Sequence, residues 1–82
     1  MRLPRDWSGD ELIKRLAKVG YSPTRQTGSH VRLTYQGEHG QHHVTIPRHS
    51  GLRVGTLNRI LLDVAGHLGI SKDMLLRQLM ED

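Results

Sequence analysis

The clearest structural signal in the sequence is GSHVRLTY, residues 28–35. A Gly-Ser pair, which is a turn signal, is followed by side chains that are alternately polar and apolar. This period of two is typical of a strand that buries one face and leaves the other in water. The apolar side chains expected to face a core are Val31, Leu33 and Tyr35.

Two further strands are expected beside this one in an antiparallel sheet. Residues 21–27 favour a strand, although Pro23 has no amide hydrogen to donate, so this strand belongs at a sheet edge or at a bulge. Residues 36–41 are polar and contain two glycines, which predicts a hairpin connection. The alternation then returns over residues 42–47, which we predict to be the third strand.

A helix is expected before the strands. Ser8 and Glu11 have the spacing of a capping box, in which Ser8 accepts the Glu11 amide hydrogen and the Glu11 side chain returns to Ser8. An apolar stripe at helical spacing follows, and Gly20 is expected to end the helix. The basic side chains of this segment are expected to be ordinary solvated charges: Lys14, Arg15 and Lys18.

Two more helices are expected after the strands. Apolar side chains from Leu57 to Val64 recur at helical spacing, and Gly66 is the expected end of that helix. Ser71 then caps a short third helix that has apolar side chains of its own to bury.

The order helix, three strands, helix, helix predicts an α+β fold, with one antiparallel sheet covered by helices on a single face. With 82 residues the chain has room for one hydrophobic core, so we expect a single domain spanning residues 1–82. This length excludes a multidomain enzyme. The sequence contains no Cys, which excludes disulfide frameworks, thiolate zinc sites, iron-sulfur clusters and cysteine nucleophiles.

The charge is concentrated in the middle of the chain. The formal net charge is +4, and residues 25–59 hold five Arg against Glu38 alone, whereas residues 60–82 carry two basic and four acidic side chains. A basic centre with an acidic end favours a surface that meets phosphate groups. No apolar run approaches the roughly 20 residues of a membrane span, and the N-terminal residues lack the hydrophobic stretch of a signal peptide. We therefore expect a cytoplasmic protein with no membrane partner.

His30 is the candidate catalytic residue. It directly follows the Gly28-Ser29 turn, whose backbone amides could lie beside the imidazole and bind phosphate oxygens. RNA carries its own nucleophile in the 2′-hydroxyl, so cleavage needs a base of near-neutral pKa and cationic stabilisation, and no metal or other cofactor. The side chains expected to bind phosphate are Arg25, Arg32, Arg48 and, from the loop after the third strand, His49. Composition and spacing alone leave open that His30 is simply a solvated side chain.

The other histidines do not favour a metal site. His39, His42 and His43 form a cluster in the sequence, but His42 and His43 are neighbours on one strand and point to opposite faces. A polar hairpin explains this cluster more simply than a bound ion does.

Five segments in this order and at these spacings resemble the HicA toxin family: residues 8–16, 20–21, 25–30, 44–49 and 55–61. The likeness covers roughly residues 8 to 80. It implies a fold similar to the double-stranded-RNA-binding domain, helix, three strands and helix, here with an additional short C-terminal helix. It also implies the toxin of a type II toxin-antitoxin system, a ribosome-independent endoribonuclease that cuts messenger RNA and is neutralised by a HicB antitoxin covering its active site.

The resemblance assigns the catalytic role to the His of a Gly-Ser-His motif, which is His30, and marks Gly28 and Ser29 as the turn that positions it. Many members have a second His at the next position, where this chain has Val31. The proton for the leaving oxygen would then come from water or from His49. Two other functions stay open: a non-catalytic module that binds double-stranded RNA by its shape, and an interaction element whose basic surface meets an acidic protein.

Overall fold

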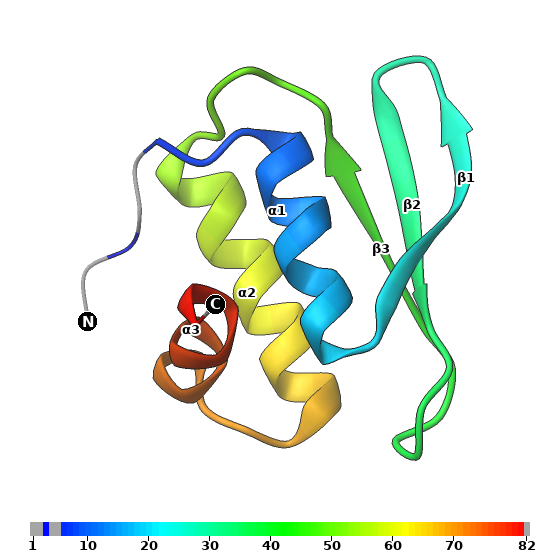
Figure 1. Ribbon diagram of the computed structural model, residues 1–82, viewed down its shortest axis with the longest axis vertical. Coiled ribbons are helices and arrows are strands. Elements are labelled where there is room, and N and C mark those ends of the chain that lie inside the picture. The colour runs from blue at the N-terminus through cyan, green and yellow to red at the C-terminus, as the bar shows by residue number, and fades with distance from the viewer. Residues whose placement is uncertain (1–2, 4–5, 82) are drawn as a thin grey trace.

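The computed structural model of the chain describes residue 3 and residues 6–81 of the 82. The predicted order of elements is confirmed, with the helices gathered over one face of the sheet (Figure 1). The elements are α1 (Gly9–Leu16), the 3-10 helix η1 (Ala17–Val19), β1 (Tyr21–Thr27), β2 (His30–Tyr35), β3 (His42–Pro47), α2 (Val54–Leu68) and α3 (Lys72–Met80). The α+β fold class expected from the sequence is therefore correct.

The sheet has the order β1-β2-β3, with both pairs antiparallel, so β2 is its central strand. The register of β1 against β2 shifts between Pro23 and Arg25. This confirms the expectation that Pro23 lies on an edge strand at an irregularity, because its missing N–H would leave a gap in a regular ladder. The other edge strand is β3.

The core lies between the sheet and the helices. All three predicted inward side chains of β2 are buried, and Leu33 is fully inaccessible. They pack in one cluster with side chains from α1, α2 and α3, among them Leu12, Leu16, Leu57, Leu61 and Leu75. On the outward face of β2 one side chain, that of Thr34, is buried although it was expected to be exposed. Its hydroxyl lies 2.7 Å from the Thr24 hydroxyl and 2.9 Å from His43 Nδ1, and these two side chains shield it from solvent.

The start of α1 follows the sequence signal in part. The Ser8 hydroxyl accepts the Glu11 amide hydrogen at 3.0 Å, as predicted. The Glu11 carboxylate does not complete the capping box but forms an ion pair with Arg15 Nε at 2.8 Å. At the other end, Gly20 has a φ of 101° and ends the helical segment, as expected.

The predicted end of α2 at Gly66 is wrong. The helix continues to Leu68 and ends at Gly69, whose φ is 71°. The amide hydrogens of Gly69 and Ile70 both return to the Ala65 carbonyl, which is how a left-handed glycine satisfies the last turn of a helix. A Gly in a helix interior costs only about 1 kcal/mol, so Gly66 does not stop the helix. None of the helices in the described part of the chain is long and apolar enough to cross a membrane.

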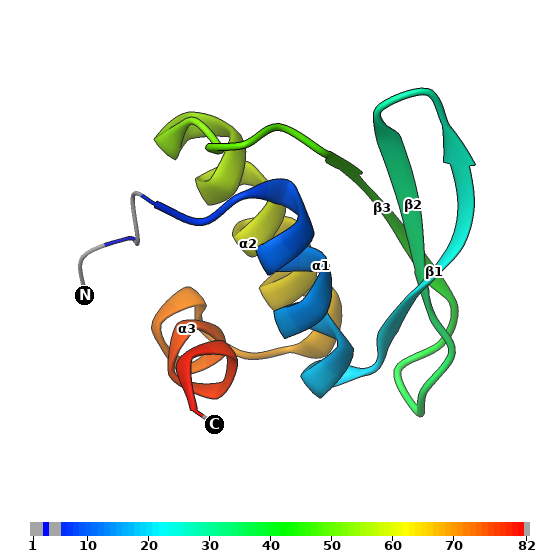
Figure 2. The same cartoon turned by 45° about the horizontal axis from the view of Figure 1, so that its top comes forward.

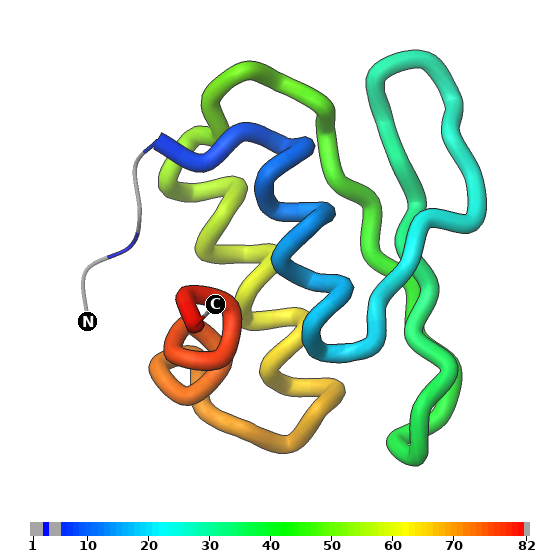
Figure 3. Tube along the Cα trace, in the orientation of Figure 1, coloured from blue at the N-terminus to red at the C-terminus, as the bar shows by residue number. Residues whose placement is uncertain are grey.

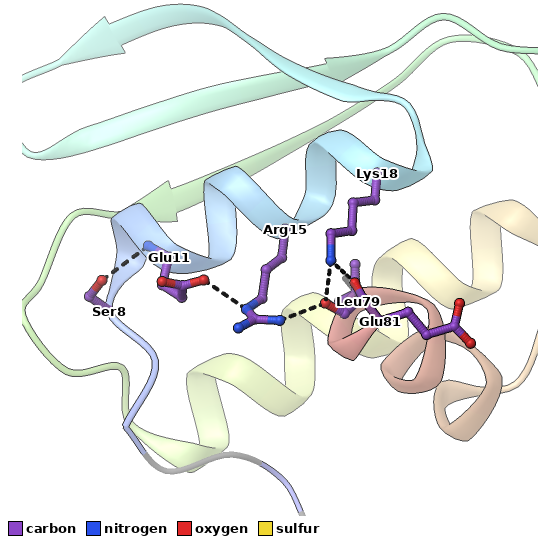
Figure 4. A network of polar contacts seen from close by, with 6 residues as sticks. All are labelled: Ser8, Glu11, Arg15, Lys18, Leu79 and Glu81. Atoms are coloured by element: carbon purple, nitrogen blue, oxygen red, sulfur yellow. Dashed lines mark hydrogen bonds and ion pairs between the residues drawn. The ribbon is translucent and has the colours of Figure 1, made fainter.

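The third helix is capped as predicted and is tied to α1. Ser71 accepts the Met74 amide hydrogen at 3.1 Å. Figure 4 shows Arg15 donating to the Leu79 carbonyl at 2.8 Å, while Lys18 donates to the carbonyls of Leu79 and Glu81. The expectation of a solvated charge is therefore wrong for Arg15, which is partly buried. Lys18 is exposed as expected, although it also donates to the last carbonyls of α3.

We predict that Arg15→Met lowers the free energy of unfolding by about 1–2 kcal/mol, because it removes a charged donor to the Leu79 carbonyl and a guanidinium stacked 4.7 Å from the Trp7 ring centroid. Chemical denaturation measures this loss. The matched control is Lys14→Met, an exposed position on the same helix, which should change stability by less than about 0.5 kcal/mol. Equal losses in the two variants would contradict the assigned role of Arg15.

Candidate functional site

Figure 2 shows that the helices gather over one face of the sheet and leave the other uncovered. A shallow hollow of about 180 Å³ lies on the uncovered face. All three strands contribute to it, because outward side chains at matching register positions come side by side. Its lining residues are Arg25, Thr27, His30, Arg32 and Thr45. The structure therefore brings His30 together with two of the arginines expected to bind phosphate.

The two arginines of the hollow are direct neighbours across the sheet. Arg25 on β1 pairs in register with Arg32 on β2, and Arg32 pairs with Thr45 on β3. Like charges directly opposite one another destabilise a sheet. Within the described residues no carboxylate lies close enough to form an ion pair with either guanidinium. The fold thus holds two forked donors beside each other without an anion from the described part of the chain, which suits a phosphate group.

His30 is exposed at the start of β2, directly after the hairpin turn. Gly28 has a φ of 59°, and no residue other than Gly has a positive φ in the described ranges, so the two-residue loop has the pattern of a type II′ turn. The Ser29 carbonyl accepts the Arg48 amide hydrogen at 2.7 Å, and the Gly28 carbonyl accepts a Gln26 side-chain hydrogen at 3.0 Å. These bonds fix the turn, and hence the point on the backbone from which the His30 side chain projects.

The amide hydrogens of the turn are open to a ligand. Neither the Gly28 nor the Ser29 amide donates to a backbone carbonyl within the part of the chain that the structure describes. This agrees with the expectation that the turn leaves backbone donors free beside His30. An anion seated in the hollow could therefore meet backbone and guanidinium donors together.

Arg48 is engaged elsewhere. Its Nε and Nη2 donate to the two carboxylate oxygens of Asp10 at 2.7 and 3.1 Å. This hydrogen bonding and the guanidinium charge hold the pKa of Asp10 below its usual 3.8, while the pKa of Arg48 is raised. The pair joins the start of α1 to the end of β3, where a Cβ on Gly9 would overlap the Pro47 carbonyl. Arg48 does not line the hollow that holds His30.

His49 also lies apart from His30. It is exposed and lines a second hollow, with Leu52, Arg53 and Thr56 among its neighbours. Its carbonyl accepts the Gly9 amide hydrogen at 2.9 Å, which ties the loop after β3 to α1. Figure 3 shows that this loop and the β1–β2 turn lie at the same end of the molecule.

The neighbouring histidines of β3 point to opposite faces, as predicted. His43 Nδ1 contacts the Thr34 hydroxyl on the outer face, whereas His42 lies on the helix side. There His42 Nδ1 is 2.7 Å from the Tyr21 hydroxyl and Nε2 is 3.2 Å from Asp63 Oδ1. Among the described residues, no three His, Asp or Glu side chains gather in a way that could hold a metal ion.

Sequence reasoning missed the contact network around His42. The His42 ring stacks on His67 with centroids 4.3 Å apart, and His67 Nε2 lies 2.9 Å from the Gly40 carbonyl. Burial, followed by the charge of Asp63, raises the pKa of Tyr21 to about 12. Asp63 and His67 lie one turn apart on α2, and both contact His42 of β3. In the sequence, their spacing of four residues is the one sign that they share a face of the helix.

We predict that the Asp10 carboxyl titrates below 3.8 and that Arg48→Gln moves its midpoint back toward this value. A carboxyl whose folded pKa is lowered adds stability above its unfolded pKa and loses it as the pH falls through the folded pKa. The wild-type chain should therefore lose this contribution on acidification below about pH 4. NMR of the carboxyl carbon measures the midpoint. Arg77→Gln is the control, and a midpoint unmoved by Arg48→Gln would exclude this pair in solution.

Comparison with known proteins gives a family. The model of the family described as "HicA toxin of bacterial toxin-antitoxin" matches residues 9–66, a stretch that includes α1, the whole sheet and most of α2. No curated protein and no solved structure matches the chain. The match spans more than half of the sequence and every residue that lines the hollow around His30. The chain belongs to the HicA toxin family of toxin-antitoxin systems.

Proposed function

We propose that this HicA toxin is an endoribonuclease that cleaves messenger RNA, with His30 as its general base and no metal requirement. The observation that carries the proposal is the hollow in which His30 stands beside the opposed, unpaired Arg25 and Arg32. A phosphodiester held by the two guanidinium groups would have its ribose within reach of the imidazole. Family membership supports the toxin role.

The proposed reaction is an attack by RNA on itself. His30 takes the proton of a 2′-hydroxyl, and the 2′-oxygen forms a bond to the adjacent phosphorus. Arg25 and Arg32 stabilise the negative charge that develops on the phosphorane oxygens, as do any free amides of the Gly28-Ser29 turn. The bond from phosphorus to the 5′-oxygen then breaks. The products are a 2′,3′-cyclic phosphate and a 5′-hydroxyl.

The departing 5′-oxygen needs a proton, and water is the best-supported donor. The hollow is shallow and open to solvent, whereas His49 lines a different hollow. The residue after His30 is Val31, which is buried beneath the strand and carries no proton to transfer. In this proposal Arg48 and His49 contact RNA outside the cleavage hollow, and Arg48 does so after exchanging Asp10 for a phosphate.

The proposed partner is a HicB-type antitoxin that covers the hollow. An acidic side chain of the antitoxin would supply Arg25 and Arg32 with the carboxylate that they lack within the described residues. In this proposal toxin, antitoxin and messenger RNA meet in the cytoplasm. A non-catalytic module for double-stranded RNA is the alternative, which the same order of helices and strands supports.

Cleavage of messenger RNA by the purified chain in EDTA should depend on His30. His30→Ala should reduce the rate by roughly 10² to 10⁴, because it removes the general base. The matched control is His43→Ala, an exposed His on the same face that does not line the hollow, and its rate should stay within a few fold of wild type. Full-rate cleavage by His30→Ala would rule out the assigned base.

The same samples separate the nuclease from the alternative function. A gel shift on duplex and single-stranded RNA, with the RNA recovered afterwards, reports binding and cleavage together. Tight binding of the duplex with complete recovery of intact RNA would favour the non-catalytic module.

The antitoxin prediction concerns the product of a small gene adjacent to that of the toxin. In the complex of the two proteins the His30 ring should be buried, so its NMR signals should shift while those of His39, at the far hairpin, stay in place. A complex that leaves His30 fully accessible would contradict inhibition by coverage.

A further inference from the structure

The hollow around His30 continues into three others through shared residues. Thr45 also lines a neighbouring hollow, with Arg59 and Ile60. Arg59 lines the next one, with Arg53 and Thr56. Arg53 and Thr56 in turn line the hollow of His49 described above. We call this series the basic path, defined by Arg25, Arg32, Thr45, Arg59 and Arg53.

The basic path crosses an edge of the sheet. It begins on the uncovered face, passes Thr45 on the edge strand β3, and reaches the N-terminal half of α2, a helix that packs against that strand. Because the whole molecule measures only 30 × 30 × 23 Å, a ligand that follows the path must turn within a few nucleotides' length.

Arginines on the path are unpaired, whereas most of the others are neutralised. Of the seven arginines that the structure describes, Arg15 and Arg48 form ion pairs with carboxylates. Four of the remaining five line the path, and the fifth, Arg77, lies on α3. One carboxylate, that of Asp63, borders the path, and its Oδ1 is already occupied by His42 at 3.2 Å. The path therefore carries four arginines that form no ion pair with a described residue, against the single carboxylate of Asp63.

The path offers little for reading bases. The chain has no Phe, and its Trp and Tyr side chains, Trp7, Tyr21 and Tyr35, are all buried. The large aromatic rings on which many single-strand binders stack bases are therefore not available on the path. Recognition along the path would rest on phosphates, and so would tolerate many sequences.

We propose that Arg59 and Arg53 bind phosphates of single-stranded RNA on one side of the cleaved bond, so that the strand leaves the His30 hollow over the edge of β3 toward the start of α2. This inference rests on the proposed function. It extends the RNA-binding site from one phosphate in the His30 hollow to several consecutive phosphates of the RNA backbone. Single-stranded RNA is flexible enough for the turn. A duplex is not, since duplex DNA has a persistence length of about 150 base pairs.

The test uses binding alone, in a chain that carries His30→Ala so that the RNA stays intact. Fluorescence anisotropy with a single-stranded RNA of mixed sequence is recorded at several salt concentrations. Arg59→Gln and Arg53→Gln should each weaken binding roughly three- to tenfold and should lower the slope of log K against log salt by about 0.7. Arg77→Gln, which removes the same charge from α3, should leave both quantities unchanged.

Three results would overturn the path. The first is that Arg59→Gln and Arg53→Gln leave both the affinity and the salt slope unchanged. The second is that Arg77→Gln weakens binding as much as these two substitutions do. The third is a duplex that binds as tightly as the single strand and depends on Arg59 in the same way. Thermal unfolding keeps the test interpretable, since neither side chain has a polar contact within the described residues and both variants should fold normally.

The outcome for the path is separate from that for the nuclease. If wild-type chain fails to cleave RNA but Arg59→Gln and Arg53→Gln still weaken binding of the single strand, the path stands and the proposed catalysis falls. If cleavage depends on His30 while the two substitutions leave binding unchanged, the catalysis stands and the path falls.

Discussion

Arg25 and Arg32 face each other across the sheet, and the proposed site is built around this opposition. Two guanidinium groups held side by side, with no carboxylate from the described residues, repel one another, and a fold optimised for stability alone would separate or neutralise them. The chain does neutralise other arginines, since Arg15 and Arg48 both have acidic partners. The repulsion is therefore local to the hollow beside His30, where a bound phosphate would relieve it.

The strand β2 links this charge to the stability of the domain. Its inward side chains join the single hydrophobic cluster, and its outward side chains supply His30 and Arg32. A slip of one residue in register would bury the charges and expose the core. The burial of Val31 and Leu33 therefore fixes the spacing of the functional groups. The hairpin turn at Gly28, with its positive φ, and the bond from the Arg48 amide to Ser29 hold the end of β2 that carries the imidazole.

Local sequence patterns predicted most of the fold. The strands followed from alternation, the edge position of β1 followed from Pro23, and both Ser caps followed from the spacing of Ser8 and Ser71 ahead of apolar stripes. The end of α2 was misplaced at Gly66 because Gly66 and Gly69 look the same in the sequence. Only Gly69 has a positive φ and ends the helix, whereas Gly66 keeps helical geometry.

The residues of the candidate site that lie on one strand or on neighbouring strands could be predicted from the sequence. The contacts that depend on the packing of distant segments could not. His30, Arg25 and Arg32 share a face because alternation and hairpin register require it. The ion pair of Asp10 with Arg48 spans 38 positions, and no pattern within either segment indicates it. The same holds for Arg59, which joins the basic path because α2 packs against β3.

The decisive measurement is a structure of the chain with a single-stranded RNA whose 2′-hydroxyls are methylated, so that it cannot be cut. We expect one phosphate within hydrogen-bonding distance of both Arg25 and Arg32, with the adjacent 2′-oxygen beside the His30 ring. An RNA bound across the helices, with the outer face of the sheet empty and His30 in solvent, would contradict it.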